Sequence, residues 1–272
     1  MIAIRQKARP SFEERSAAGG YRESWLLRGF ARYARRYVRS HFDALRLLGD
    51  APAVPPPNGP LVVYVNHASW WDPLTLMVLL RDCFPERSFA APMDPVALAR
   101  YGILRRLGCF FAVEPATPRG ARQFLASARA ILAENGRALC VTPQGRFADV
   151  REHPVRLAGG LAHLLASHEP APVVLPLALE YTFWNERTPN VFAHFGAPLE
   201  GAADAEGWQQ QLEARLAESQ QILAAAVIAR DPAAFTALLQ GRAGTGGVYG
   251  WWQRVRSWCG GRAHDERHPV AR

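Results

Sequence analysis

The chain has 272 residues, of which 49% are hydrophobic, and its formal net charge at pH 7 is +8. This length allows one large domain with a sizeable core. No apolar run approaches the ~20 residues that a membrane-spanning helix needs, which argues against a chain that crosses a membrane. Arginine supplies nearly all of the positive charge, since Lys7 is the only lysine. A basic protein of this kind is expected to meet an anionic partner, such as membrane headgroups, nucleic acid or a phosphorylated substrate.

The cysteines indicate a reducing, cytoplasmic compartment. Their spacing includes no CxxC pair and is not typical of a zinc site or of a disulfide framework. Cys109 and Cys140 lie in apolar runs, so we expect buried thiols there. Residues 1–20 lack the apolar segment of a signal peptide, and we expect them to form a polar, disordered tail.

The segment 25–48 has the periodicity of a helix, in which apolar and aromatic side chains recur every three or four residues and arginine fills much of the remainder. A helix of this length would span ~36 Å. It would belong to an amphipathic, basic region over 21–58 that ends in a proline-rich linker. Two interpretations remain open, a helix on a membrane surface or a helix packed on the next domain with solvated arginines. The recurring positions are Leu26, Phe30, Tyr33, Tyr37, His41, Leu45 and Leu48.

Strands and helices alternate over 59–240, and this alternation predicts an α/β domain with a largely parallel central sheet covered by helices. The N-terminal amphipathic helical segment would precede that domain. A glycine-rich, aromatic and basic tail is expected over 241–272. The predicted strands are 61–65, 88–91, 109–113, 137–142, 173–179 and 191–195, and the predicted helices are 73–80, 95–107, 119–135, 157–167, 208–230 and 232–239.

Two polar clusters, 66–72 and 143–147, directly follow predicted strands. Ligands of parallel sheets bind beyond the carboxyl ends of the strands, so these clusters indicate a site. The first cluster contains the pattern N-H-x4-D, in which His67 is suited to general-base work near neutral pH. The carboxylate of Asp72 could orient that histidine and stabilise its charged form.

The same cluster also has a purely structural interpretation. Asp72 and Pro73 could start a helix, with the aspartate as N-cap and the proline as the first helical residue. Trp70 and Trp71 could pack in the core, or they could form an apolar wall or a membrane-interface anchor. We expect at least one of the two tryptophans to pack.

Four blocks in this order resemble those of the glycerolipid acyltransferases, the family of glycerol-3-phosphate and 1-acylglycerol-3-phosphate acyltransferases. Their order over one domain is more specific than any single block. The blocks are NHASWWDP at 66–73, LGCFFAVEP at 107–115, TPQGRF at 142–147 and VVLPLAL at 173–179.

The resemblance implies that His67 is the general base and that Asp72 orients it. An acceptor hydroxyl would attack the thioester carbonyl of an acyl-CoA or an acyl carrier protein directly, without an acyl-enzyme. The acceptor would be a lysophospholipid such as 1-acylglycerol-3-phosphate, and neither a cofactor nor a metal is expected. The implied substrate-binding residues are Asn66, Phe111, Glu114, Gln144, Gly145 and Arg146, the last as a ligand of phosphate.

Two positions depart from the family pattern and bear on the acceptor. Gln144 replaces a glutamate of the third block, and Glu114 stands where the family usually has a phosphate-binding arginine. A carboxylate repels phosphate, so Arg119 or Arg122 would have to take over, or the acceptor lacks a simple phosphate. The alternative acceptor is therefore the hydroxyl of a lyso-aminolipid or a glycolipid.

The family resemblance also favours a membrane surface as partner. The contact would run through 25–48, with 248–258 as a second segment, on a peripheral or monotopic protein at the cytoplasmic face of the inner membrane. The net charge alone leaves a weaker alternative, a non-catalytic nucleic-acid-binding protein. The sequence has no recognisable nucleic-acid motif, so nucleic acid is not expected as a partner.

Overall fold

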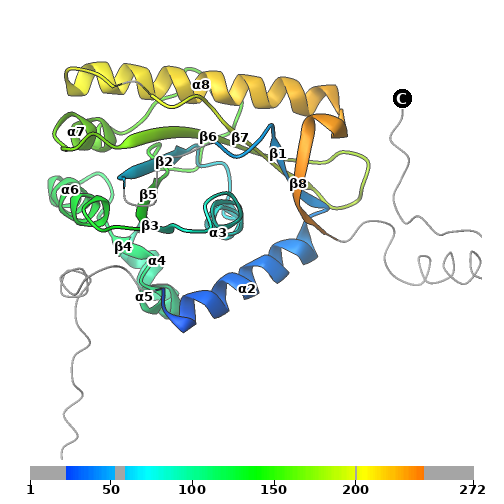
Figure 1. The fold of residues 1–272 in the computed structure, drawn as a ribbon, viewed down its shortest axis with the longest axis horizontal. Helices are drawn as coiled ribbons and strands as arrows, with labels where there is room; N and C mark the ends of the chain where they lie inside the picture. The colour runs from blue at the N-terminus through cyan, green and yellow to red at the C-terminus, as the bar shows by residue number, and fades with distance from the viewer. Residues whose placement is uncertain (1–22, 53–58, 200, 242–272) are drawn as a thin grey trace, which may run out of the picture.

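The structure is a computed structural model that describes residues 23–52, 59–199 and 201–241. The described chain forms an α/β domain around one sheet with the strand order β4-β3-β5-β2-β6-β7-β1-β8 (Figure 1). The predicted fold class is therefore confirmed. The tails predicted over 1–20 and 241–272, apart from Gly241, lie outside the described residues, as does the membrane contact predicted for 248–258.

The elements lie close to the predicted ones over most of the chain. The strands are β1 Ala44–Leu48, β2 Leu61–Val65, β3 Ser88–Met93, β4 Phe110–Ala112, β5 Arg137–Val141, β6 Val173–Thr182, β7 Asn190–Phe195 and β8 Phe235–Gln240. The helices are α2 Trp25–His41, α3 Asp72–Cys83, α4 Pro95–Arg100, α5 Gly102–Leu107, α6 Pro118–Leu132, α7 Gly160–Ala166 and α8 Ala205–Ala229, followed by the 3₁₀ turn η1 Pro232–Ala234.

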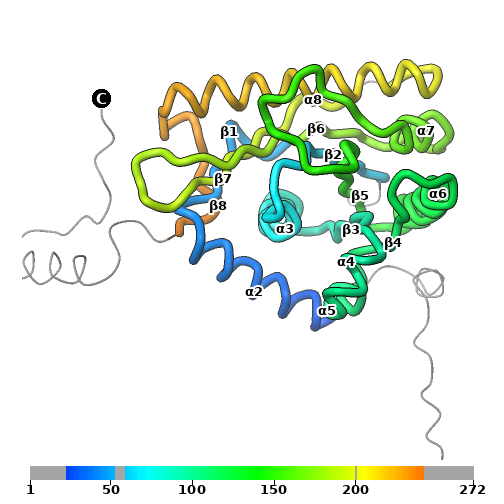
Figure 2. The backbone as a smooth tube through the Cα atoms, turned by 180° about the vertical axis from the view of Figure 1, so that it is seen from behind, coloured from blue at the N-terminus to red at the C-terminus, as the bar shows by residue number. Residues whose placement is uncertain are grey.

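Five strands, from β4 to β6 in the sheet order, run parallel to one another. Their carboxyl ends therefore meet at one edge, which we call the C-terminal edge. Helices α6, α7 and α8 cover one face of the sheet, and α2 and α3 cover the other, with α4 and α5 beside them (Figures 1 and 2). Beyond β6 the sheet continues with β7, which is antiparallel to β6, then β1, which is parallel to β7, and then β8, which is antiparallel to β1.

The predicted helix over 25–48 is wrong in its second half. Helix α2 ends at His41, and residues 44–48 form β1, which pairs with β7 and β8. The leucines of ALRLL fit a helical spacing as well as the alternation of a strand. Long-range pairing decides between the two, since Leu45 and Leu47 are buried on one face of the sheet, while Arg46 points to the other.

Helix α2 packs on the domain through its apolar stripe. Leu27 joins a cluster with Leu107 and Cys109 beside α5, and Ala34 and Val38 join the main core. The apolar stripe is therefore not free to enter a membrane. The exposed side of α2 carries arginines and aromatic rings instead.

Two further predicted helices differ from the structure. The predicted helix 232–239 is wrong, because only the turn η1 forms before 235–240 pair with β1 as the edge strand β8. The predicted helix 95–107 is divided at Tyr101, whose backbone leaves the helical region (φ −109°, ψ 72°) before α5 begins at Gly102.

The buried thiols are expected to lower the free energy of unfolding in alkaline solution. Burial raises the pKa of Cys109 and of Cys140 to about 12, whereas an unfolded thiol titrates at about 8.5. The stability from these neutral thiols is present below about pH 8.5 and is lost as the pH rises towards the folded pKa. We expect the free energy of unfolding in urea to fall between about pH 9 and pH 11. Cys140→Ala should reduce that slope by up to about 1.4 kcal/mol per pH unit, and an unchanged slope would contradict the prediction.

Candidate active site

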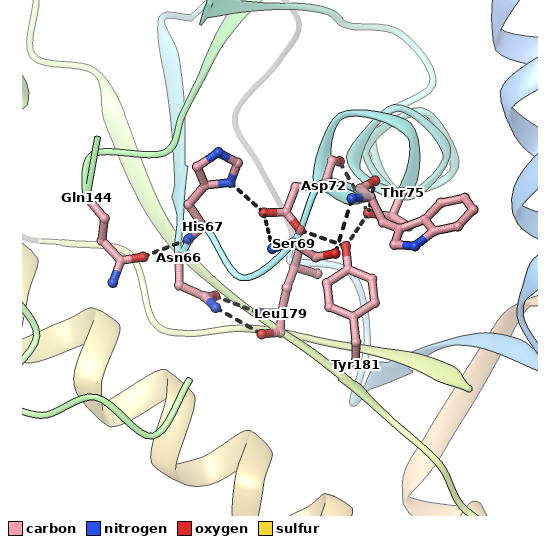
Figure 3. A network of polar contacts seen from close by, with 9 residues as sticks. Asn66, His67, Ser69, Asp72, Thr75, Gln144, Leu179 and Tyr181 are labelled. Carbon is pink, nitrogen blue, oxygen red and sulfur yellow. Dashed lines mark hydrogen bonds and ion pairs between the residues drawn. The ribbon is translucent and has the colours of Figure 1, made fainter. Parts of the chain in front are cut away.

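His67 and Asp72 meet at the C-terminal edge, just beyond the end of β2. Nδ1 of His67 lies 2.6 Å from Oδ2 of Asp72 (Figure 3). The turn 68–71 brings the two together, which a straight helix would not do at a spacing of five. Because a carboxylate only accepts hydrogen bonds, the proton of the neutral imidazole sits on Nδ1 and Nε2 is the basic nitrogen. Within the described part of the chain, Nε2 forms no hydrogen bond.

The carboxylate of Asp72 is almost fully buried, with a side chain 1% exposed, and it is fully hydrogen-bonded. Besides His67, it accepts the backbone N–H of Ser69 at 3.2 Å and the hydroxyl of Tyr181 at 2.7 Å. Oγ1 of Thr75 lies 2.8 Å from that phenol oxygen. Burial and the nearby charge of Asp72 raise the pKa of Tyr181 well above its usual value, so the phenol stays protonated and keeps donating. These donors offset the cost of burying the carboxylate.

The predicted N-cap role of Asp72 is wrong. Asp72 is the first residue of α3, Trp71 takes the N-cap position, and no side chain caps the helix. The aspartate instead turns its carboxylate back towards His67. Trp71 packs against the main core, with its ring 4.9 Å from that of Phe42, which confirms that one tryptophan packs. Trp70 is exposed.

The loop after β5 forms hydrogen bonds with both the backbone N–H and the backbone carbonyl of His67. Oε1 of Gln144 accepts the N–H of His67 at 2.7 Å, and the carbonyl of His67 accepts the N–H of Ala148 at 2.9 Å. The ring of Phe147 lies 4.3 Å from the imidazole, centroid to centroid. The second polar cluster therefore contacts the pair His67 and Asp72, which we call the dyad. Within that cluster, Gln144 positions the histidine.

Gly145 and Arg146 lie in the same loop, on its exposed side. Gly145 has a left-handed backbone (φ 67°), which favours glycine, and its N–H donates to the carbonyl of Thr142. The guanidinium of Arg146 is ion-paired with Glu152 in the solvent. An exposed ion pair contributes little stability, so an anionic ligand can replace Glu152 at small cost.

Three predicted substrate-binding residues have other surroundings. The buried amide of Asn66 exchanges two hydrogen bonds with the backbone of Leu179, at 2.9 and 2.8 Å, and fastens β2 to β6. Phe111 is buried against Phe124, and Glu114 lies 3.6 Å from the guanidinium of Arg119.

Phe111 and Glu114 belong to β4 and the loop after it. At ~4.8 Å per strand, β4 lies ~14 Å from β2 across the sheet. None of the described contacts of Phe111 or Glu114 joins either residue to the dyad. The structure therefore brings the first and third sequence blocks together and leaves the second apart from them.

Sequence reasoning missed Tyr181 and Phe147. Tyr181 lies beyond the predicted end of its strand, and only the longer β6 carries it to Asp72. Phe147 is the last residue of the third block, and its aromatic side chain was the feature of the sequence that could have marked it as a site residue. Among the described residues, no group of histidine, cysteine or carboxylate side chains could hold a metal ion.

Comparison with known proteins bears on the same region. Residues 49–180 match the family model described as Acyltransferase. The match includes the dyad, the loop after β5 and most of β6. No curated protein matches the chain.

Proposed function

We propose that this protein moves a fatty acyl group from an acyl thioester to a hydroxyl of a lysophospholipid. The match of residues 49–180 to the family model described as Acyltransferase supports acyl transfer in general. Acyl-CoA or an acyl carrier protein would supply the thioester. The observation that carries the proposal is the contact between His67 and Asp72, which leaves Nε2 as an oriented, accessible base. Such a base is what a weakly nucleophilic hydroxyl needs near neutral pH.

In the proposed reaction, Nε2 of His67 takes the proton of the acceptor hydroxyl while the hydroxyl oxygen attacks the thioester carbonyl. The new C–O bond forms first. The C–S bond then breaks, and the leaving thiolate takes the proton from the imidazolium. Asp72 stabilises the imidazolium between these steps.

Backbone amides of the loop after β5 are the proposed donors to the oxyanion. The N–H of Gly145 is already bonded to Thr142, but those of Arg146 and Phe147 form no hydrogen bond to any described residue. They follow the left-handed glycine, a conformation in which successive N–H groups form an anion-binding concavity. The contact between Phe147 and the imidazole ring supports a position next to the base.

The acceptor headgroup has a second candidate. Glu152 pairs with Arg146 and Glu114 pairs with Arg119, so carboxylates of the chain itself accompany two of the three cations considered for phosphate; Arg122 has no ion pair with a described residue. This pairing favours the same chemistry on the hydroxyl of a lyso-aminolipid or glycolipid. The proposed location is peripheral or monotopic, at the cytoplasmic face of the inner membrane. Of the helices described, none is long and apolar enough to cross a membrane.

An acceptor panel tests the proposal. The purified full chain is assayed with acyl-CoA and with acyl carrier protein donors against 1-acylglycerol-3-phosphate, a lyso-aminolipid and a lyso-glycolipid. We expect turnover of 1-acylglycerol-3-phosphate. Turnover of only the phosphate-free lipids would select the second candidate. Failure with every acceptor, together with tight, salt-sensitive oligonucleotide binding, would favour the nucleic-acid-binding alternative.

Gln144→Glu tests the electrostatics of the base. The glutamate keeps an acceptor for the N–H of His67 but adds a negative charge beside the imidazole. A nearby carboxylate favours the imidazolium, so we expect the acidic limb of the pH profile of kcat/KM to move to higher pH. Gln144→Ala, which removes the acceptor without adding charge, should lower kcat and leave that limb in place. An unmoved limb in Gln144→Glu would contradict the expected effect of a charge at position 144 on the base.

A further inference from the structure

The arginines of this protein differ sharply in their partners from one side of the molecule to the other. Around the C-terminal edge and on α8, exposed guanidinium groups are paired with carboxylates, as in Arg146–Glu152, Arg151–Asp149 and Arg215–Glu218. The arginines that have neither a hydrogen bond nor an ion pair with any described residue are Arg32, Arg36, Arg39, Arg100, Arg105, Arg106 and Arg122.

All of these unpaired arginines except Arg122 lie on three neighbouring helices. Arg32, Arg36 and Arg39 lie on α2, and the others on α4 and α5. The start of α2 lies beside α5, and α4 leads into α5 (Figures 1 and 2). Helix α2 contains no acidic residue. A concentration of unpaired positive charge on one side indicates an anionic partner.

The same helices also expose apolar side chains. Trp25 is 77% exposed on α2, and Val96 is 74% exposed on α4. Tyr33 on α2, Ile103 on α5 and Tyr101 between α4 and α5 are exposed as well. The exposed arginines and these apolar side chains of α2, α4 and α5 together form what we call the basic–apolar surface. Aliphatic side chains such as Val96 and Ile103 have no use against a nucleic-acid backbone, whereas a lipid surface takes up both kinds of side chain.

A series of aromatic rings connects this surface with the dyad. The ring of Tyr33 lies 5.5 Å from that of Tyr37, which lies 5.4 Å from that of Trp71. Trp71 directly precedes Asp72, and its ring lies 5.6 Å from that of the exposed Trp70. Tyrosine and tryptophan are the residues that membrane proteins place at the lipid–water boundary.

We propose that the basic–apolar surface, including α4 and α5, docks on an anionic lipid surface and thereby presents the His67 site to lipid substrate. The arginines bind the headgroups, and the apolar side chains enter the boundary with the acyl chains. The part that concerns substrate rests on the proposed function. Docking itself does not, because it depends on the surface alone.

The charge of the surface is tested with full-length protein and vesicles of phosphatidylcholine, with or without phosphatidylglycerol. The triple variant Arg32→Gln, Arg36→Gln, Arg39→Gln should bind phosphatidylglycerol vesicles about a hundredfold more weakly, since each arginine near such a surface contributes about fivefold. The control Arg129→Gln, Arg215→Gln, Arg230→Gln removes the same charge from α6 and α8, including the C-cap of α8, and should bind like the wild type. Equal losses in the two variants would overturn the proposal.

The apolar part is tested by Val96→Asp with Ile103→Asp. This pair should lose most vesicle binding, whereas Ile222→Asp with Ile228→Asp, which alters exposed isoleucines of α8, should not. Wild-type protein that prefers an oligonucleotide to the vesicles would also overturn the proposal.

Activity separates this proposal from the proposed function. Both surface variants should keep wild-type turnover of short-chain, water-soluble substrates and lose turnover of substrate held in vesicles. His67→Ala should bind vesicles like the wild type and transfer no acyl group. Full activity in His67→Ala would contradict the proposed mechanism but not the proposed docking. Equal turnover of vesicle-bound substrate in all surface variants would contradict only the role of docking in activity.

Discussion

Replacing His67 with alanine is expected to lower kcat for acyl transfer about a thousandfold or more. The imidazole is the base that the dyad orients, and general-base catalysis of this kind contributes roughly 10²- to 10⁴-fold. The measurement is steady-state transfer from acyl-CoA to the acceptor that the panel identifies.

The fold should survive this substitution. The side chain of His67 is 21% exposed, and its aromatic neighbour Phe147 is itself exposed, so little core packing is lost. Because the substitution removes one donor from the buried carboxylate of Asp72, we expect the free energy of unfolding to fall by about 1–3 kcal/mol. His163→Ala, which changes an exposed histidine of α7, is the matched control and should keep full activity. Substantial acyl transfer by folded His67→Ala would contradict the mechanism.

Asp72→Asn is expected to impair both catalysis and stability. The asparagine has one NH2 group and one oxygen, so its NH2 would face either the hydroxyl of Tyr181 or the Nδ1–H of His67, both of which donate to Asp72. Where the NH2 faces His67, the histidine would adopt the tautomer that puts the proton on Nε2, where the base is needed, and a loss of roughly 10²- to 10⁴-fold in kcat should follow. The mismatched buried donors should lower the free energy of unfolding by about 1–3 kcal/mol.

Asp82→Asn is the matched control, because Asp82 lies on the same helix but pairs with Arg35 near the surface. That variant should keep kcat and lose less than about 1 kcal/mol of stability. Urea unfolding and steady-state kinetics on the two variants separate the roles. Wild-type activity in Asp72→Asn would mean that His67 does not need its carboxylate partner.

Local patterns were sufficient for the α/β class, most of the central elements and the pairing of His67 with Asp72. The hydrophobic periodicity within each strand and helix follows which of its side chains are buried, so β2, α6 and β5 could be predicted within a few residues. The dyad could be predicted because both partners lie within six residues, at the end of a strand. The resemblance of four blocks to acyltransferases agrees with the family match over 49–180.

Contacts between distant residues decided the rest. Residues 44–48 and 235–240 are strands because they pair with each other, a contact between segments almost 200 residues apart that helical propensity cannot register. Tyr181 reaches Asp72 and Gln144 reaches His67 only through the order of the strands in the sheet. Helix α2 is a further example, since its sequence pattern predicts an apolar stripe but does not say whether protein or lipid covers that stripe. The folded domain covers that stripe, which leaves the arginines and aromatic rings of α2 to face outward.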